Sequence, residues 1–171
     1  MTPGDDVCIE PADPASVDAQ AALRHYLAEI AARIPQGQTG PDEAEAVDDY
    51  RPPDGVFLLV SAGDTVVGCG AVRRLEPGVG EVKRMWIDPN ARGRGLGRRL
   101  LDALEDAAHA RGYHRLRLDT HEVLVQAIGL YETQGYRRIG RYNDHPDPTH
   151  FYEKVLGDAR EPAQPPPERA R

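Results

Sequence analysis

Three glycines at alternating positions form the most chemically informative segment of this sequence. Gly93, Gly95 and Gly97 lie between a β-rich run and an amphipathic run of helical period. Glycine has no Cβ atom, so the backbone there can approach a ligand closely and direct successive N–H groups at one point. The positive end of the following helix dipole adds to this effect. The segment therefore predicts a site for an anion.

The charges around this segment also favour an anionic ligand. Between positions 83 and 99 there are six basic residues and one acid, in a chain whose formal net charge is −7. Arg94, Arg98 and Arg99 lie at the start of the predicted helix, where the dipole prefers acids. Cations there are unfavourable unless an anion compensates them. The local excess of positive charge can attract a polyanion to a surface that is otherwise acidic.

Two familiar phosphate-binding patterns do not fit. A Walker loop needs Gly-Lys-Ser/Thr, which is absent. A dinucleotide fingerprint needs Gly-x-Gly-x-x-Gly early in the fold, whereas the spacing here is Gly-x-Gly-x-Gly after several strands. The anion is therefore expected to belong to another class of ligand.

Apolar periodicity and turn residues predict the elements that position the segment. Helices are expected at 16–34, capped by Ser16, at 96–111 and at 124–134, with a further short helix around 43–49. Strands are expected at 7–10, 56–61, 65–75, 81–87, 116–120, 137–142 and 150–156. This order predicts a mixed α+β sheet with at least one parallel crossover near its middle. Residues 1–156 are expected to form one domain and 157–171 a disordered tail.

The pattern Arg92-x-x-Gly95-x-Gly97 resembles the cofactor loop of the GNAT superfamily of N-acetyltransferases. A second stretch, AIGLYE at 127–132 followed by Gly135-Tyr136, is similar to that family's A-x-x-L-Y-E-x-x-G-F/Y helix ending. Residues 81–89, 96–111 and 116–120 resemble its central strand, cofactor helix and next strand. The resemblance implies a mostly antiparallel central sheet with one parallel, splayed strand pair, flanked by helices. The ending of the chain is similar to a bacterial subgroup that we expect to act on small molecules.

The resemblance implies acetyl-CoA as co-substrate and no metal. Backbone groups of Met85, Trp86 and Ile87 would pair with the pantetheine arm in the opening between the splayed strands. The phosphates would be held by the loop and its arginines, namely Arg92, Gly93, Arg94, Gly95, Leu96, Gly97 and Arg98. Many members carry asparagine seven residues before the tyrosine of the helix ending. Here Leu124 stands at that position, so the contact is missing or is supplied elsewhere, for example by Gln126.

The resemblance also suggests the catalytic groups. Tyr131 occupies the position of the family's general acid, and a phenol with a pKa near 10 can protonate a thiolate whose thiol titrates near 8.5. Glu81 is the candidate general base, working through water, with Asp119 and His121 as alternatives near the same opening. The N–H group of Ile87 is expected to meet the developing oxyanion.

The acceptor amine is less defined. Arg24, Arg51, Arg141 and His150 could receive a carboxylate, whereas the acidic surface would suit a polyamine or an aminoglycoside. A small-molecule primary amine is favoured over a folded protein because no long insertion is present. The alternatives are a non-catalytic acyl-CoA sensor and a nucleotide- or phosphate-binding domain of another kind.

Composition narrows the remaining classes. The chain has 171 residues, 40% hydrophobic and 29% charged, and no apolar run of the roughly 20 residues that cross a membrane. The acidic charge argues against nucleic acid as the main partner. The first residues have no apolar core, and Cys8 and Cys69 have no metal or redox spacing, so a cytoplasmic location is expected. The oligomeric state is open, and a homodimer is one option.

Overall fold

The computed structural model describes residues 6–34 and 47–157. In chain order the strands are β1 (Val7–Pro11), β2 (Val56–Ala62), β3 (Thr65–Glu76), β4 (Val79–Ile87), β5 (Arg115–Thr120), β6 (Arg137–Ile139) and β7 (His150–Val155). The α-helices are α1 (Val17–Arg33), α2 (Leu96–Ala110) and α3 (Val125–Thr133), and two short 3₁₀ helices cover Val47–Tyr50 and Pro89–Ala91.

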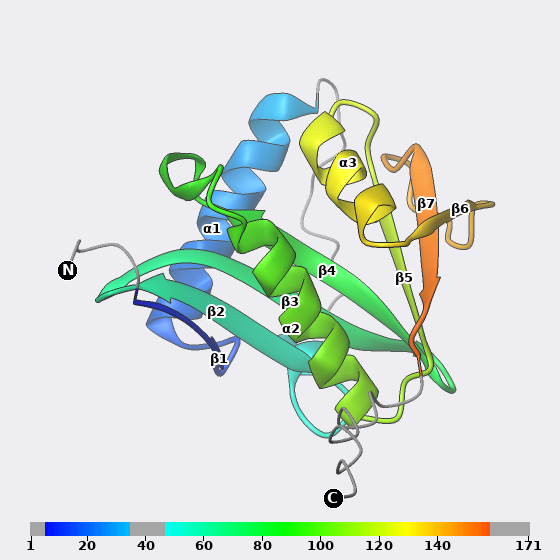
Figure 1. Cartoon of the computed structure of the whole chain (residues 1–171), viewed down its shortest axis with the longest axis horizontal. Helices are drawn as coiled ribbons and strands as arrows, with labels where there is room; N and C mark the ends of the chain where they lie inside the picture. The colour runs from blue at the N-terminus through cyan, green and yellow to red at the C-terminus, as the bar shows by residue number, and fades with distance from the viewer. Residues whose placement is uncertain (1–5, 35–46, 158–171) are drawn as a thin grey trace, which may run out of the picture.

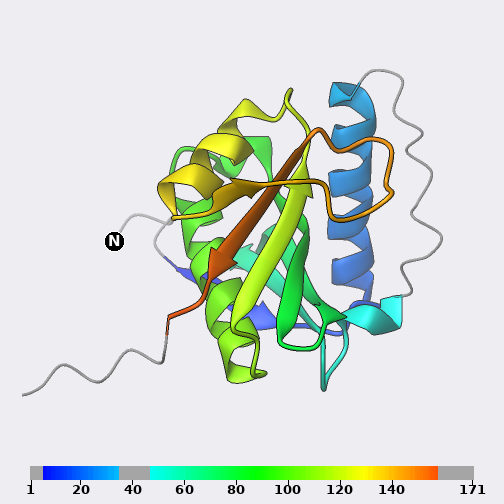
Figure 2. The same cartoon turned by 90° about the vertical axis from the view of Figure 1, so that its right-hand side faces the viewer.

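All seven strands form one sheet in the order β1-β2-β3-β4-β5-β7-β6. Every neighbouring pair is antiparallel except β4 and β5, which are parallel. Helix α1 packs on one face of the sheet, and α2 and α3 lie on the other (Figures 1 and 2). The predicted mixed α+β sheet with a single parallel pair near its middle is thus confirmed.

Most predicted elements appear within a residue or two of their expected bounds. Ser16 caps α1, because its hydroxyl oxygen accepts the N–H of Ala19. The strand expected at 137–142 is shorter and ends at Ile139. Beyond it the side chain of Arg141 donates to the carbonyl groups of His145 and Pro148, and these bonds hold the chain in a loop instead of a ladder.

Two predictions fall partly outside the described residues. The short helix expected around 43–49 is represented by the 3₁₀ helix that begins at Val47, and residues 35–46 are not described. The tail expected to be disordered lies outside the described residues from 158 onward.

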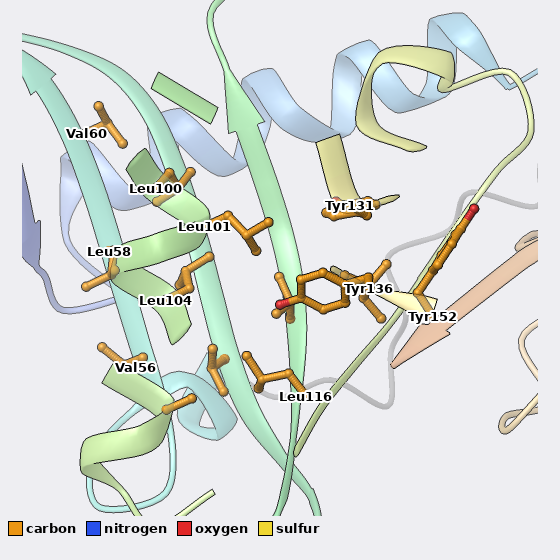
Figure 3. Packing of buried hydrophobic residues seen from close by; sticks show 14 of the residues in the cluster. Val56, Leu58, Val60, Leu100, Leu101, Leu104, Leu116, Tyr131, Tyr136 and Tyr152 are labelled. Atoms are coloured by element: carbon orange, nitrogen blue, oxygen red, sulfur yellow. The ribbon is translucent and has the colours of Figure 1, made fainter. Parts of the chain in front are cut away.

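The larger core cluster lies between α2, α3 and the sheet (Figure 3). The apolar stripe of α2 is fully buried at Leu100, Leu101 and Leu104, facing valines and leucines of the central strands. Tyr131 of α3, Tyr136 and Tyr152 of β7 form the aromatic end of the same cluster. The stripe thus fixes α2, and with it the glycine segment, against the sheet.

Strands β4 and β5 pair over only three residues, Val79–Glu81 with Arg115–Arg117. Farther along, β4 contains a bulge, because Arg84 and Met85 together stand opposite the single residue Gly70 of β3. Arg84 has a φ of 57°, a left-handed value that few side chains adopt. The bulge bends β4 away from β5, and the two strands separate toward the top of Figure 1. We call the resulting opening the fork.

Glu81 lies where the fork begins and is fully buried. Its Oε1 accepts from the Nε atom of Arg73 at 2.9 Å, and its Oε2 accepts from the hydroxyl of Tyr142 at 2.7 Å. Lys83 Nζ lies 3.8 Å from Oε1. Burial and the Glu81 charge raise the pKa of Tyr142, so the phenol stays a donor. This network fastens β3, β4 and the loop after β6 at the base of the fork.

The network predicts that Glu81→Gln destabilises the protein. Removing the carboxylate leaves the guanidinium of Arg73, 22% exposed, without its main counter-charge. We expect a loss of about 2–3 kcal/mol in the free energy of unfolding, below the roughly 3–5 kcal/mol of a fully buried pair. Urea denaturation measures it. The control is Glu76→Gln, a half-exposed partner of Arg117, which should change stability by less than about 0.5 kcal/mol. Equal effects of the two substitutions would contradict the assignment.

Candidate active site

The glycine segment forms an open cradle directly before α2. Gly93 and Gly95 have φ values of 79° and 73°, and a Cβ atom added at either would meet nothing within 4 Å. Their left-handed backbone therefore requires glycine for conformation, not for lack of space. Helix α2 begins at Leu96 without a side-chain cap and without an acid in its first turn. Its first N–H groups are thus available to an anion.

The predicted arginines divide into two groups. The side chains of Arg94 and Arg98 are exposed and make no hydrogen bond or ion pair with any residue in the described ranges, so both can meet phosphates. Arg92 is instead held by the protein. Its Nη2 atom donates to both carboxylate oxygens of Glu29 on α1, at 2.7 and 2.6 Å, and its Nε atom donates to the carbonyl of Ile87.

Trp86 belongs to the same junction between α1 and β4. Its indole N–H donates to Glu29 at 2.8 Å, and its ring stacks on His25 at 5.4 Å. Although burial raises the pKa of Glu29, the hydrogen bonds from Arg92 and Trp86 outweigh it and hold that pKa below its usual range. The carboxylate therefore stays charged at neutral pH. Arg92 and Trp86 thus fix the position of the glycine segment relative to α1.

The edge of β4 that faces the fork presents backbone groups. The Asp88 N–H donates to the carbonyl of Val67 on the β3 side. Because successive residues of a strand alternate in direction, the N–H and C=O groups of Ile87 point away from β3, into the fork. The side chain of Arg92 donates a hydrogen bond to the Ile87 carbonyl. The N–H of Ile87 is the group predicted to meet an oxyanion.

Two hollows meet at the fork. The first, a cleft of about 310 Å³, is bounded by the glycine segment, the end of β4, α1 and α3. Of the predicted cofactor residues, all except Arg94 line it: Met85, Trp86, Ile87, Arg92, Gly93, Gly95, Leu96, Gly97 and Arg98. Gln126, the suggested substitute for the missing asparagine, lines it too, as does Leu124.

The second hollow, of about 160 Å³, lies deeper between the arms of the fork. Its walls come from α1, β4, the end of β5, α3 and the loop between β6 and β7. Six residues line both hollows and so mark their junction: Tyr26, Ile30, Met85, Leu124, Ala127 and Tyr131. We refer to the first hollow as the cofactor cleft and to the second as the acceptor pocket.

Tyr131 stands at that junction with its ring fixed. Its ring centroid lies 5.9 Å from that of Tyr136 and 6.3 Å from that of Tyr152 (Figure 3). Gly135, with a φ of 90°, ends α3 by allowing the N–H of Tyr136 to bond back to the Tyr131 carbonyl. Burial raises the pKa of Tyr131, and the nearby Tyr26 and Asp119 raise it further. The phenol therefore carries its proton at neutral pH.

The candidate bases are placed differently from one another. Glu81 lines neither hollow, and its carboxylate is occupied by Arg73 and Tyr142, so the geometry does not favour the predicted role as base. Asp119 and His121, the alternatives, both line the acceptor pocket. The Nδ1 atom of His121 accepts the N–H of Val123 at 3.2 Å.

The residues suggested for acceptor recognition do not line the acceptor pocket. Arg51 pairs with Asp13 and Asp48, and Arg141 holds its own loop and lies over Phe151. Arg24 and His150 are also absent from the lining. The pocket instead takes its polar groups from β4, the end of β5 and the loop after β6: Lys83, Arg84, Asp119, Thr120, His121, His145 and Asp147. Of this set, Asp119 and His121 were expected from the sequence near the opening. The others could not be found from sequence patterns, because strands and a loop distant in sequence bring them together.

Within residues 6–34 and 47–157, no helix is long and apolar enough to cross a membrane.

Known proteins resemble this chain both in sequence and in fold. An IAA acetyltransferase from Azospirillum brasilense is 46% identical over 107 residues, which cover 61% of this chain and 70% of that protein. The structure of a protein from Klebsiella pneumoniae, provisionally assigned as an acyl-CoA N-acyltransferase, superposes with a TM-score of 0.73 at 34% identity, covering 89% and 99% of the two chains. A GNAT family acetyltransferase from Elizabethkingia anophelis with acetyl-CoA bound shares the fold, with a TM-score of 0.65 and 16% identity over 89% and 99% of the chains.

The model of the Acetyltransferase (GNAT) family matches residues 24–136, a range that holds the C-terminal part of α1, the fork, the glycine segment and Tyr131. The chain therefore belongs to the GNAT family, and it is an acetyltransferase.

Proposed function

We propose that the protein transfers the acetyl group of acetyl-CoA to the primary amine of a small molecule, by direct attack while both are bound. The observation that carries this proposal is the junction of two hollows at Tyr131. An amine in the acceptor pocket and a thioester in the cofactor cleft would meet there, next to a buried phenol and the N–H of Ile87. Direct transfer then needs no nucleophile from the enzyme.

The residues of the cofactor cleft fit the parts of acetyl-CoA. Its phosphates suit the open glycine cradle, the start of α2, and Arg94 and Arg98. Its amide-bearing pantetheine arm suits the β4 edge, which beyond Glu81 has no strand partner on the fork side among the residues that the structure describes. A fit to both the charged and the amide parts favours this ligand over a simple phosphate.

The chain's own groups divide the chemical work. The acetyl thioester supplies an activated carbonyl carbon. The N–H of Ile87 would stabilise the negative charge that develops on the carbonyl oxygen. Tyr131 would donate its proton to the departing thiolate, since a phenol is the weaker acid of the two and its buried position keeps the proton in place.

The size and walls of the acceptor pocket favour a small molecule. The pocket has a smaller volume than the cofactor cleft, and α1 and the residue that follows it line the pocket with the apolar side chains of Leu27, Ile30 and Ile34. The name of the Azospirillum relative places IAA among the compounds to be screened. A ribosomal-protein-S18-alanine N-acetyltransferase from Escherichia coli shares this fold at 16% identity, so peptides belong in the same screen.

The cofactor assignment predicts selective stabilisation by acetyl-CoA. A ligand that binds only the folded state raises the thermal midpoint, and we expect acetyl-CoA and CoA to raise it while NAD and ATP do not. Gly95→Glu should abolish the shift, because it places a carboxylate in the cradle. Gly63→Glu is the matched control, since Gly63 also has a positive φ and open space but lies in the β2–β3 turn. Equal shifts with NAD or ATP, or a shift that survives Gly95→Glu, would refute the assignment.

Catalysis by Tyr131 predicts that Tyr131→Phe lowers kcat for amine-dependent thiol release by about 100-fold or more at neutral pH. The thermal shift by CoA should persist, because the ring still packs on Tyr136 and Tyr152. Thiol release from acetyl-CoA is followed with a thiol reagent across a panel of amines. If the wild type binds acetyl-CoA tightly but none of the amines and peptides causes it to release thiol, the alternative of a non-catalytic acyl-CoA sensor is correct.

A further inference from the structure

We propose that Asp119 is the carboxylate that binds the acceptor's ammonium group and takes its proton; this proposal rests on the acetyl transfer proposed above. Asp119 lies on β5 two residues beyond Arg117, where pairing with β4 ends. It is therefore on the β5 arm of the fork, and it lines the acceptor pocket. The opposite arm carries Met85 at the junction with the cofactor cleft.

The carboxylate of Asp119 is held in place but keeps capacity for a ligand. The Nδ2 atom of Asn143 donates to its Oδ2 at 2.7 Å. Its Oδ1 accepts no hydrogen bond, and neither oxygen has a Lys, Arg or His nitrogen within 4 Å, among the residues that the structure describes. A half-buried carboxylate needs hydrogen-bond donors and a compensating positive charge, and an incoming ammonium group would supply both.

The charge of Asp119 acts at the place where the reaction would occur. It is among the causes that raise the pKa of both Tyr26 and Tyr131, the two phenols that line both hollows. The titratable and charged groups that line the same pocket are Tyr26 on α1, Lys83 and Arg84 on β4, His121 after β5, Tyr131 on α3, and His145 and Asp147 in the loop after β6. After burial and the Glu81 charge, the Asp119 charge also raises the pKa of Tyr142 in that loop.

The other candidates in reach are less suited to take a proton. Glu81 lines neither hollow, and both of its carboxylate oxygens already accept hydrogen bonds, from Arg73 and from Tyr142. In His121 and His145 the Nδ1 atom already accepts a backbone N–H, so a neutral ring has its proton on Nε2 and no free lone pair. Asp147 lines the acceptor pocket but is not among the charges that act on Tyr131.

The protons balance in a simple sequence. Asp119 takes one proton from the ammonium group and passes it to solvent. The neutral amine then forms the N–C bond with the thioester carbonyl as the C–S bond breaks, and the sulfur receives the proton of Tyr131. A second proton leaves the nitrogen and restores the Tyr131 phenol. One proton is released for each acetyl group transferred, and Tyr131 and Asp119 return to their starting states.

The test compares Asp119→Asn with the wild type in steady-state assays of thiol release. The acceptor is whichever of phenethylamine, L-leucine and spermidine the wild type uses fastest. We expect kcat at saturating amine and pH 7 to fall by about 100-fold or more. The loss should shrink as the pH approaches the pKa of the amine, because neutral amine then arrives from solution. The thermal shift by CoA should remain that of the wild type.

Asp147→Asn is the matched variant, because it removes the same charge from the same pocket. A substitution that only weakens the electrostatic attraction between the pocket and the ammonium group raises KM for the amine and leaves the pH dependence of kcat unchanged. We expect this result for Asp147→Asn. A kcat of Asp119→Asn that is unchanged, or that falls by the same factor at every pH, overturns the proposal. Absence of thiol release by the wild type with every amine and peptide of the screen would refute the proposed transfer itself, whereas an active wild type with an unaffected Asp119→Asn would refute only the role of Asp119.

Discussion

The site depends on the short pairing between β4 and β5. Three paired residues are enough to make the two strands neighbours, and the bulge at Arg84 and Met85 then separates them. If the ladder continued, β5 would occupy the backbone groups at the end of β4 and close the acceptor pocket. The base of the fork is held by a buried carboxylate, Glu81, which binds side chains of β3 and of the loop after β6. Glu81, which was predicted from the sequence as a general base, thus holds the base of the fork together.

A second set of contacts places the glycine segment relative to the fork. Glu29 of α1 receives Arg92 and Trp86, and Arg92 also reaches the carbonyl of Ile87. The helix that lines the acceptor pocket is therefore tied to the segment that would hold the phosphates. Because α1 contributes Tyr26 and Ile30 to both hollows, a displacement of α1 would change both at once. Arg92 thus holds the glycine segment in place, and in the described part of that segment and the first turn of α2 the side chains of Arg94 and Arg98 make no such bond and can meet a ligand.

The sequence predicted the parts of the site whose geometry is local. Alternating glycines followed by a leucine stripe predict a loop and helix, and the resemblance of the helix that ends at Gly135 to the family's motif singles out Tyr131. Contacts between distant segments could not be predicted in this way. The pairing of Arg92 with Glu29 spans 63 positions, and that of Glu81 with Tyr142 spans 61. The bulge at Arg84 is equally hidden, because arginine gives no sign of a positive φ. The acceptor pocket draws on β4, β5, α1, α3 and a loop. Tyr131, Asp119 and His121 were expected near the opening, and most of the remaining lining emerged only from the fold.

The central claim is that the fork holds the thioester between Ile87 and Tyr131, and a crystal structure of the protein with CoA tests it most directly. The account predicts that the pyrophosphate lies on the N–H groups of the glycine segment and that the pantetheine runs beside Met85–Ile87. The sulfur should then lie near the Tyr131 hydroxyl, at the mouth of the acceptor pocket. A CoA molecule that left the fork empty, or whose sulfur lay far from Tyr131, would contradict the account.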